Sequence, residues 1–153
     1  LYEYLPFPLP VIISVLYKFI AFGNASSFIW VCTKLYVINI ISKNSLEAEV
    51  TITDGINELV CFSQPCNFKL NQILVEPAYC FNNKYVVRST SNKYSIEKLK
   101  EPLAYNLVGK IIDKKNCLIQ IGQIILQLEE HSIPKDILEN EYISCYCQRI
   151  DIY

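Results

Sequence analysis

The sequence predicts a mainly β protein built from two similar units, and three observations carry this prediction. Several short runs alternate apolar and polar residues, which is typical of strands with one buried face. Turn residues separate these runs, and no long helical pattern lies between them. The chain also matches itself at an offset of 69 residues. We therefore expect two tandem OB-like or small-barrel units, or one sandwich built of two similar halves, with a short apolar amino-terminal helix.

The length and the charge narrow the classes of function. A chain of 153 residues can bury one ordinary core or two very small barrels that share an interface. Its 14 basic and 15 acidic residues leave no net field that would attract nucleic acid or an acidic membrane surface. Binding of either kind would need a local patch of positive charge.

Residues 1–34 form an apolar segment whose place in the folded domain the sequence leaves open. Three prolines, Pro6, Pro8 and Pro10, exclude a helix before Val11. The apolar run over residues 11–22 is shorter than the roughly 20 residues that a spanning helix needs. We expect a core-packing helix there and no membrane contact, unless further residues precede this segment.

The first β unit is expected over residues 35–89. Residues 46–53 alternate apolar and polar side chains, and Asp54 and Gly55 then supply a turn. Further strands are expected over residues 59–63, 73–81 and 84–88.

Residues 90–105 are rich in serine, asparagine and lysine, which predicts a linker or a short helix that starts at Ser95. The second β unit is expected over residues 106–153, with strands at 107–112, 117–121, 124–128 and 142–152. In its last strand, Ile143, Cys145 and Cys147 share one face, but Ile150 and Ile152 have the opposite parity. This change of phase predicts a bulge near Gln148.

The internal repeat depends on five pairs of residues at one offset. The pairs are Val50 with Ile119, Ile52 with Ile121, Leu59 with Leu128, Pro65 with Pro134, and Asn71 with Asn140. Apolar strands of any origin align fairly well, so the shared proline and asparagine are the informative matches.

No arrangement of residues typical of catalysis or metal binding is recognisable. The seven cysteines lack the spacing of a secreted disulfide scaffold, which favours a reducing cytoplasm. Six are expected to be small buried hydrophobes: Cys32, Cys61, Cys80, Cys117, Cys145 and Cys147. The one histidine, His131, is expected in an exposed turn, and the four glycines are too scattered for a phosphate-binding loop. We expect no enzyme activity, no cofactor and no metal.

The best hypothesis for function is a non-enzymatic protein that binds a protein partner through a β surface, as adaptors, inhibitors and immunity-type proteins do. The binding residues would be Tyr142 and Tyr146, on the strand face opposite the cysteines, and Tyr153 at the end of the chain. Self-association through unpaired strand edges is a related option.

The alternative hypothesis is an OB-like protein that binds single-stranded nucleic acid. Phosphates need cations and bases need flat rings, and one stretch of the chain interleaves the two. The residues concerned are Lys84, Tyr85, Arg88, Lys93, Tyr94, Lys98 and Lys100. The neutral total charge and the presence of only two arginines, Arg88 and Arg149, favour a protein partner over nucleic acid.

Overall fold

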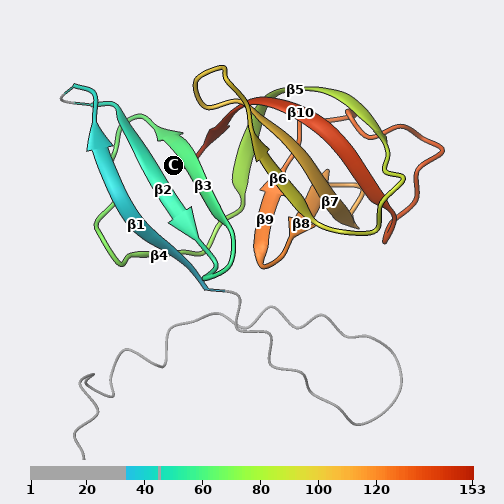
Figure 1. The fold of residues 1–153 in the computed structure, drawn as a ribbon, viewed down its shortest axis with the longest axis horizontal. Coiled ribbons are helices and arrows are strands. Elements are labelled where there is room, and N and C mark those ends of the chain that lie inside the picture. Colours follow the sequence, from blue (N-terminus) through green and yellow to red (C-terminus); the bar gives the residue numbers. More distant parts are fainter. Residues whose placement is uncertain (1–33, 45) are drawn as a thin grey trace, which may run out of the picture. The chain divides into compact units, whose positions relative to one another are not determined.

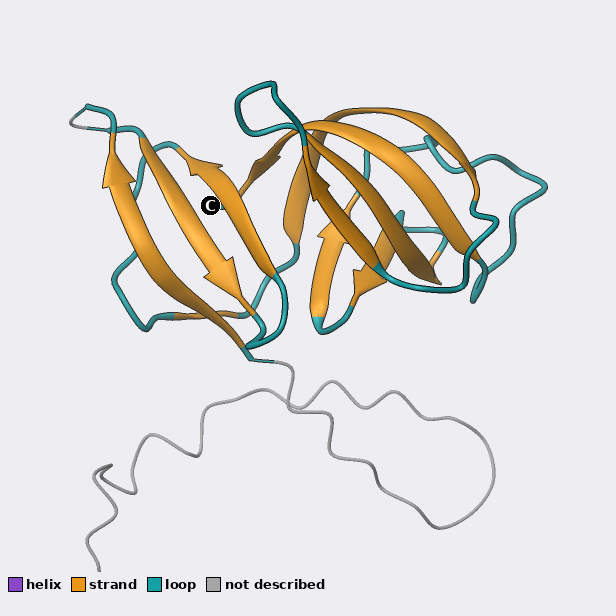
Figure 2. Cartoon of the chain, viewed as in Figure 1, coloured by secondary structure: helices purple, strands orange, loops and turns teal. Residues whose placement is uncertain are grey.

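Ten β-strands and no helix form the part of the chain that the computed structural model describes, residues 34–44 and 46–153 (Figures 1 and 2). The strands are β1 Leu35–Ser42, β2 Ala48–Thr53, β3 Glu58–Ser63, β4 Ile73–Leu74, β5 Ala78–Arg88, β6 Ser95–Lys98, β7 Tyr105–Asp113, β8 Leu118–Ile121, β9 Ile124–Gln127 and β10 Tyr142–Asp151. The prediction of a mainly β protein is confirmed. The expected helix over residues 11–22 lies outside the described residues, and within them no helix could span a membrane.

Five strands close into a barrel. The meander β7–β8–β9 is antiparallel throughout, and β10 pairs with the first strand of this meander, β7. The ring is completed by β5, which is antiparallel to β10 and parallel to β9. Figure 1 shows β5 and β10 running side by side across the top of this barrel.

Outside the barrel, β6 pairs with β7, and three further strands form a second meander, β1–β2–β3, that continues the same sheet. The short strand β4 pairs with β1, and the carboxyl end of β10 pairs in parallel with β3, where Asp151 faces Phe62. The peptide N–H of Ile152 extends this pairing with a 2.9 Å hydrogen bond to the Phe62 carbonyl. The sheet therefore runs without a break from one meander to the other.

Equivalent positions of the two meanders make equivalent contacts. Asn71 and Asn140, the asparagines of the internal repeat, both have a left-handed backbone, with φ of 63° and 70°. Their N–H groups donate to the carbonyls of Val37 in β1 and Ile111 in β7, at 2.8 and 2.9 Å. In return, Val37 and Ile111 donate to the carbonyls of Gln72 and Glu141, both at 2.9 Å. Asparagine tolerates this backbone better than most residues, which explains why both copies carry it.

The strand pairing does not follow the boundary expected between residues 89 and 90. Strand β5 follows the first meander in the chain but forms the barrel with β7–β10. Strand β10 follows the second meander, and its end pairs with β3 of the first. The described residues, 34–44 and 46–153, accordingly lie in one compact unit.

Two local predictions are wrong. Residues Ser95–Lys98 form strand β6, not a short helix, because Ile96 packs against the core while the backbone pairs with β7. The bulge is not near Gln148, since the register of β10 with β5 is continuous from Asp151 to Tyr146. The register shift lies between Tyr146 and Ser144.

The core is one cluster of buried side chains that spans both meanders. Five of the six cysteines expected to be buried, Cys61, Cys80, Cys117, Cys145 and Cys147, belong to it, and Cys32 lies outside the described residues. Burial raises the pKa of the Cys145 thiol to about 12, and it raises that of Cys61 as well. These thiols therefore stay protonated and behave as small apolar side chains.

The hairpin turns of the two meanders touch at Asp54 and Gln123. The Asp54 carboxylate accepts hydrogen bonds from the backbone N–H groups of Gln123, at 2.8 Å, and Asn57, at 2.7 Å. Partial burial acts to raise the pKa of Asp54, but these hydrogen bonds outweigh it and lower that pKa. Gly122 lies beneath this contact with φ of +60°.

We expect Gly122→Ala to destabilise the protein by about 2 kcal/mol or more, because strain and crowding combine. A Cβ atom there would lie 2.6 Å from the Asp54 carboxylate and 2.5 Å from the Asn57 amide nitrogen. Gly55 is the matched control, since its φ is +91° but a Cβ would meet no atom within 4 Å. Gly55→Ala should cost only about 1 kcal/mol in urea unfolding. Equal losses for the two variants would show that the hairpin contact does not hold Gly122.

Candidate interaction surface

A groove crosses the outer face of the sheet where β5, β10, β7 and β6 lie next to one another. Its volume is about 370 Å³. We call it the tyrosine groove and define it by its lining residues: Tyr85, Val87, Ser95, Glu97, Asn106, Leu107, Val108, Ser144, Cys145 and Tyr146. Strands β5 and β6 flank the groove, while β10 and β7 form its centre.

Cross-strand register explains why these side chains meet. Residues that are paired across an antiparallel sheet project from the same face. One row across the four strands is Val87, Ser144, Val108 and Ser95. The next row is Lys84, Tyr146, Asn106 and Glu97. The face therefore combines aliphatic, hydroxyl, amide and aromatic groups.

Tyr85 stands out from these rows because it lies in a β-bulge. Lys84 faces Tyr146 and Val87 faces Ser144, so Tyr85 and Val86 together oppose the single residue Cys145. Tyr85 has φ of +55° and its side chain is 77% exposed. A left-handed backbone is uncommon for an aromatic residue, and strained residues of this kind cluster at functional sites. The bulge thus presents an aromatic ring to the groove.

A tyrosine also marks each end of the groove. At one end, the rings of Tyr94 and Tyr142 contact each other with their centroids 5.5 Å apart. At the other, the Tyr146 hydroxyl donates to the Glu101 carboxylate at 2.8 Å, which raises the pKa of Tyr146. Four tyrosines from the two competing hypotheses therefore share one face of the barrel.

The structure does not bring the remaining tyrosine to this face. Tyr153 is the last residue, is 81% exposed and does not line the groove. The sequence analysis proposed only Tyr85 and Tyr146 among the lining residues, and it missed the others, which include Ser95, Asn106 and Val108. The alternation of residues 105–113 could have placed Asn106 and Val108 on the outer face. Ser95 was missed because β6 was not expected to be a strand.

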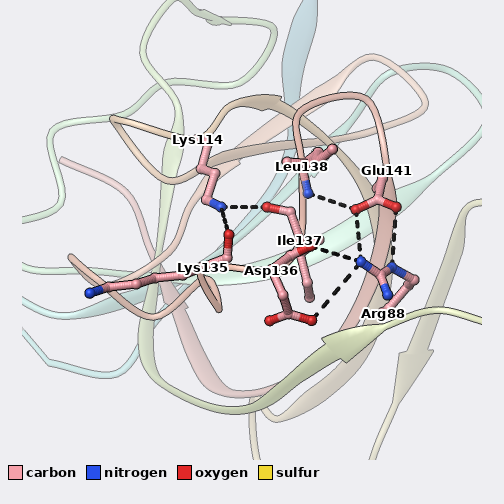
Figure 3. A network of polar contacts seen from close by, with 7 residues as sticks. All are labelled: Arg88, Lys114, Lys135, Asp136, Ile137, Leu138 and Glu141. Atoms are coloured by element: carbon pink, nitrogen blue, oxygen red, sulfur yellow. Dashed lines mark hydrogen bonds and ion pairs between the residues drawn. The ribbon is translucent and has the colours of Figure 1, made fainter.

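Arg88 is engaged in a polar network beside the groove (Figure 3). Its guanidinium group contacts the Glu141 carboxylate at 3.1 Å and donates to the Asp136 carbonyl at 2.9 Å. The same arginine lines a second cavity of about 250 Å³ with Tyr142. Because a carboxylate already neutralises this guanidinium, Arg88 is poorly suited to bind phosphate.

Lys114 and Glu141 hold the loop between β9 and β10. The Lys114 ammonium donates to the carbonyls of Lys135 and Ile137, as Figure 3 shows. The Leu138 N–H donates to Glu141 at 2.6 Å. This bond, together with the contact from Arg88, lowers the pKa of Glu141.

The other basic residues of the nucleic-acid hypothesis do not gather on the groove face. Lys84 pairs with Tyr146 on that face, whereas Lys98 pairs with the buried Tyr105 and so projects from the opposite face of β6. Lys84 belongs to β5 and Lys98 to β6, while Lys93 and Lys100 lie in the loops before and after β6. All four are exposed, and within the described residues none of them takes part in an ion pair. In contrast, Glu97 is held by the Asn106 side-chain amide at 3.1 Å.

His131 is exposed with φ of 61°, in a turn as expected. Among the residues that the structure describes, no group of histidine, cysteine and carboxylate side chains could hold a metal ion.

The fold and this surface define a small, mainly β protein with a five-stranded barrel. Comparison with protein families matches residues 34–153 to the family described as "Uncharacterised conserved protein UCP019853", and the chain belongs to that family. No curated protein and no solved structure gives a significant match.

We expect Glu141→Gln to lower stability at neutral pH but not in acid. The pKa of Glu141 is lower in the folded protein than its ordinary value of 4.5, so its contribution is present above that value. The contribution is lost as the pH falls through the lowered pKa. Urea unfolding at about pH 7 and about pH 3 measures both cases.

The matched control is Glu130→Gln, at an exposed carboxylate without a side-chain hydrogen bond in the described part of the chain. It should leave the pH dependence unchanged. A Glu141→Gln variant that keeps the full acid sensitivity of the native protein would contradict the assignment.

Proposed function

We propose that this chain is a non-enzymatic binding protein that presents the tyrosine groove to a protein partner. The observation that carries the proposal is the bulge at Tyr85, which holds a 77% exposed aromatic ring beside Tyr146 and Val87. Exposed aromatic residues next to aliphatic ones are the usual anchors of protein interfaces. A bulge that exposes such a ring has no evident value for stability alone.

The barrel is suited to this role, and we infer that it is OB-like. Counted from β7, the three-stranded meander is followed by β10, which pairs with the first strand of the meander. The closing strand, β5, pairs with both β10 and β9, but it precedes the meander in the chain. We read this arrangement as an OB-type order with its last strand moved to the front. Barrels of this kind bind ligands on an outer face.

Single-stranded nucleic acid is the second candidate ligand. Exposed lysines without an ion pair within the described residues favour it, namely Lys84 on the groove face and Lys93 and Lys100 in the loops next to β6. The engagement of Arg88 by Glu141 weighs against it, as does the total charge of −1. We therefore place the protein partner first.

Two further points belong to the proposal. The outer edge of β6, which has no strand partner among the described residues, offers a route to self-association, although Lys98 and the shortness of this strand oppose edge pairing. A reducing cytoplasm suits the six described cysteines, which are all free thiols.

The test is a selection of peptides from a displayed random library by the full chain, followed by binding measurements with variants. We expect Tyr85→Asn to weaken binding of the selected peptides at least about tenfold, as for an interface anchor. Asparagine tolerates a left-handed backbone, so this variant should keep the native unfolding midpoint.

Tyr153→Asn is the matched control, because Tyr153 is as exposed as Tyr85 but lies outside the groove. It should leave peptide binding within about twofold of the native value. Selection of no peptide at all, or equal losses for the two variants, would count against the groove as the binding site.

A further inference from the structure

We propose that two copies of this chain pair through the free edge of β1, with the two strands antiparallel and a twofold axis at Ile41. Strand β1 is an outer strand of the meander β1–β2–β3 (Figure 1). Ile41 does not line the tyrosine groove, so this contact is separate from the proposed function. The inference follows from the backbone groups that β1 leaves open and from how this strand differs from its counterpart, β7.

Strands β1 and β7 are equivalent only as far as a bulge. Val37 and Ile111 make the same pair of backbone hydrogen bonds with the loop that follows their meander. In both strands the register against the neighbouring strand then shifts by one residue. After this bulge β7 ends at Asp113, whereas β1 continues past the matching residue, Asn39, through Ile40–Ser42. The extension beyond the bulge therefore belongs to β1 alone.

The residue that follows β7 is already engaged by its own chain. This residue is Lys114, which matches Ile40 in β1. Its backbone N–H donates to the Glu139 carboxylate at 3.2 Å, and its ammonium group donates to two carbonyls of the loop before β10. Among the hydrogen bonds of the described residues, none of this kind is made by Ile40. The matching position is thus satisfied in one copy of the repeat and open in the other.

The open backbone groups of β1 belong to Ile40 and Ser42. In an antiparallel pair, alternate residues bond to the neighbouring strand, and those between them direct their N–H and C=O groups to the other side. The Lys43 N–H donates to the Glu47 carbonyl at 2.8 Å, so Ile41, two residues earlier, is also bonded to β2. Ile40 and Ser42 therefore point away from β2. Strand β4 pairs only with the start of β1, so no strand in the described part of the chain meets these groups.

This edge is complementary to itself. When two copies pair antiparallel about Ile41, Ile40 of each copy lies opposite Ser42 of the other. Each open N–H then meets an open C=O, and all the free groups of both residues are satisfied. A register shifted by two residues would satisfy only half of them. Ile41, which is 50% exposed, would lie opposite its own copy and bury an apolar contact.

The side chains favour this edge over that of β6. Edge strands are commonly protected from pairing by charged residues. Strand β6 carries Glu97 and Lys98, whereas no charged residue occurs between Leu35 and Ser42. Ile41 and the bulge residue Ile38 are instead exposed apolar side chains. A second copy brings an edge with the same open groups and no opposing charge, which makes it the partner that fits.

The experiment is sedimentation velocity of the full chain from about 1 to about 300 µM, a range suited to a small interface. We expect a monomer–dimer equilibrium within this range. Ile41→Lys should weaken the dimer at least about tenfold, because two ammonium groups would face each other across the axis. Ile56→Lys is the matched control, since Ile56 is 88% exposed in the hairpin turn after β2. It should change the dimer affinity by about twofold or less.

Two further variants locate the axis and the edge. Ile41→Glu should be as weak a dimer as Ile41→Lys, but an equimolar mixture of the two should associate again, because opposite charges then meet. Ser42→Pro removes one open N–H at a position where an edge strand accepts proline. It should weaken the dimer at least about tenfold. Urea unfolding midpoints close to the native value would show that each variant still folds.

Three outcomes would overturn the inference. A full chain that stays monomeric at about 300 µM would remove the dimer. A dimer that is unchanged in Ile41→Lys and Ser42→Pro would place self-association elsewhere on the chain. Failure of the mixed Ile41 variants to associate would remove the axis at this residue. The Ile41→Lys monomer should bind library-selected peptides as the native chain does, so the test of the groove remains independent of the test of the dimer.

Discussion

The antiparallel pairing of β5 with β10 is the constraint on which the rest of the structure depends. The register runs from Ile143 opposite Arg88 to Asp151 opposite Tyr79, and each strand has further partners along its length. Strand β10 also pairs with β7 near its start and with β3 near its end, while β5 also pairs with β9. Without this pairing, the barrel would lose its closure, and the end of β10 that pairs with β3 would lose the strand that supports it on its other side. The two meanders therefore cannot be separated by a simple cut of the chain.

The end of this ladder is reinforced by Arg149. Its guanidinium carbon lies 4.4 Å from the centroid of the Phe62 ring and 4.9 Å from that of Phe81. The same group contacts the buried carboxylate of Asp151 at 2.6 Å. Phe62 belongs to β3 and Phe81 to β5, so one cation joins the first meander to the central ladder. A buried carboxylate needs such a partner, and the aromatic faces add attraction to the cation. Both arginines of the chain thus make ion pairs within the fold.

The parts of this architecture that depend on local signals could be predicted from the sequence. Alternation identified the strand around Val50 and Ile52, and the matched asparagines Asn71 and Asn140 marked backbone positions that are left-handed in both copies. Strand β5 follows the first meander in the chain but pairs with strands of the barrel. This pairing joins strands that are far apart in the sequence, and the alternation of apolar and polar residues does not encode it. The change in which residues of β10 face the core is present in the structure, since Cys147 and Ile150 are both buried. It arises without a register shift between β10 and β5. The sequence analysis identified the tyrosines of the site but did not predict that they lie close together. The bulge that exposes Tyr85 leaves no pattern in the neighbouring residues.

The position of the tyrosine groove follows from the same ladder. Only where β10 lies between β5 and β7 do the rows of side chains extend across four strands, and the bulge falls within this stretch. The inner faces of these strands carry Leu107, Ile143 and Cys145 into the core, so the outer face can vary in chemistry without loss of packing. Hydrogen bonds then determine which charges on that face stay available. Asn106 and Tyr146 hold Glu97 and Glu101, whereas Lys84, which pairs with Tyr146 on the same face, is exposed. The ladder thus leaves the Tyr85 ring exposed next to carboxylates that are already engaged by neighbouring side chains.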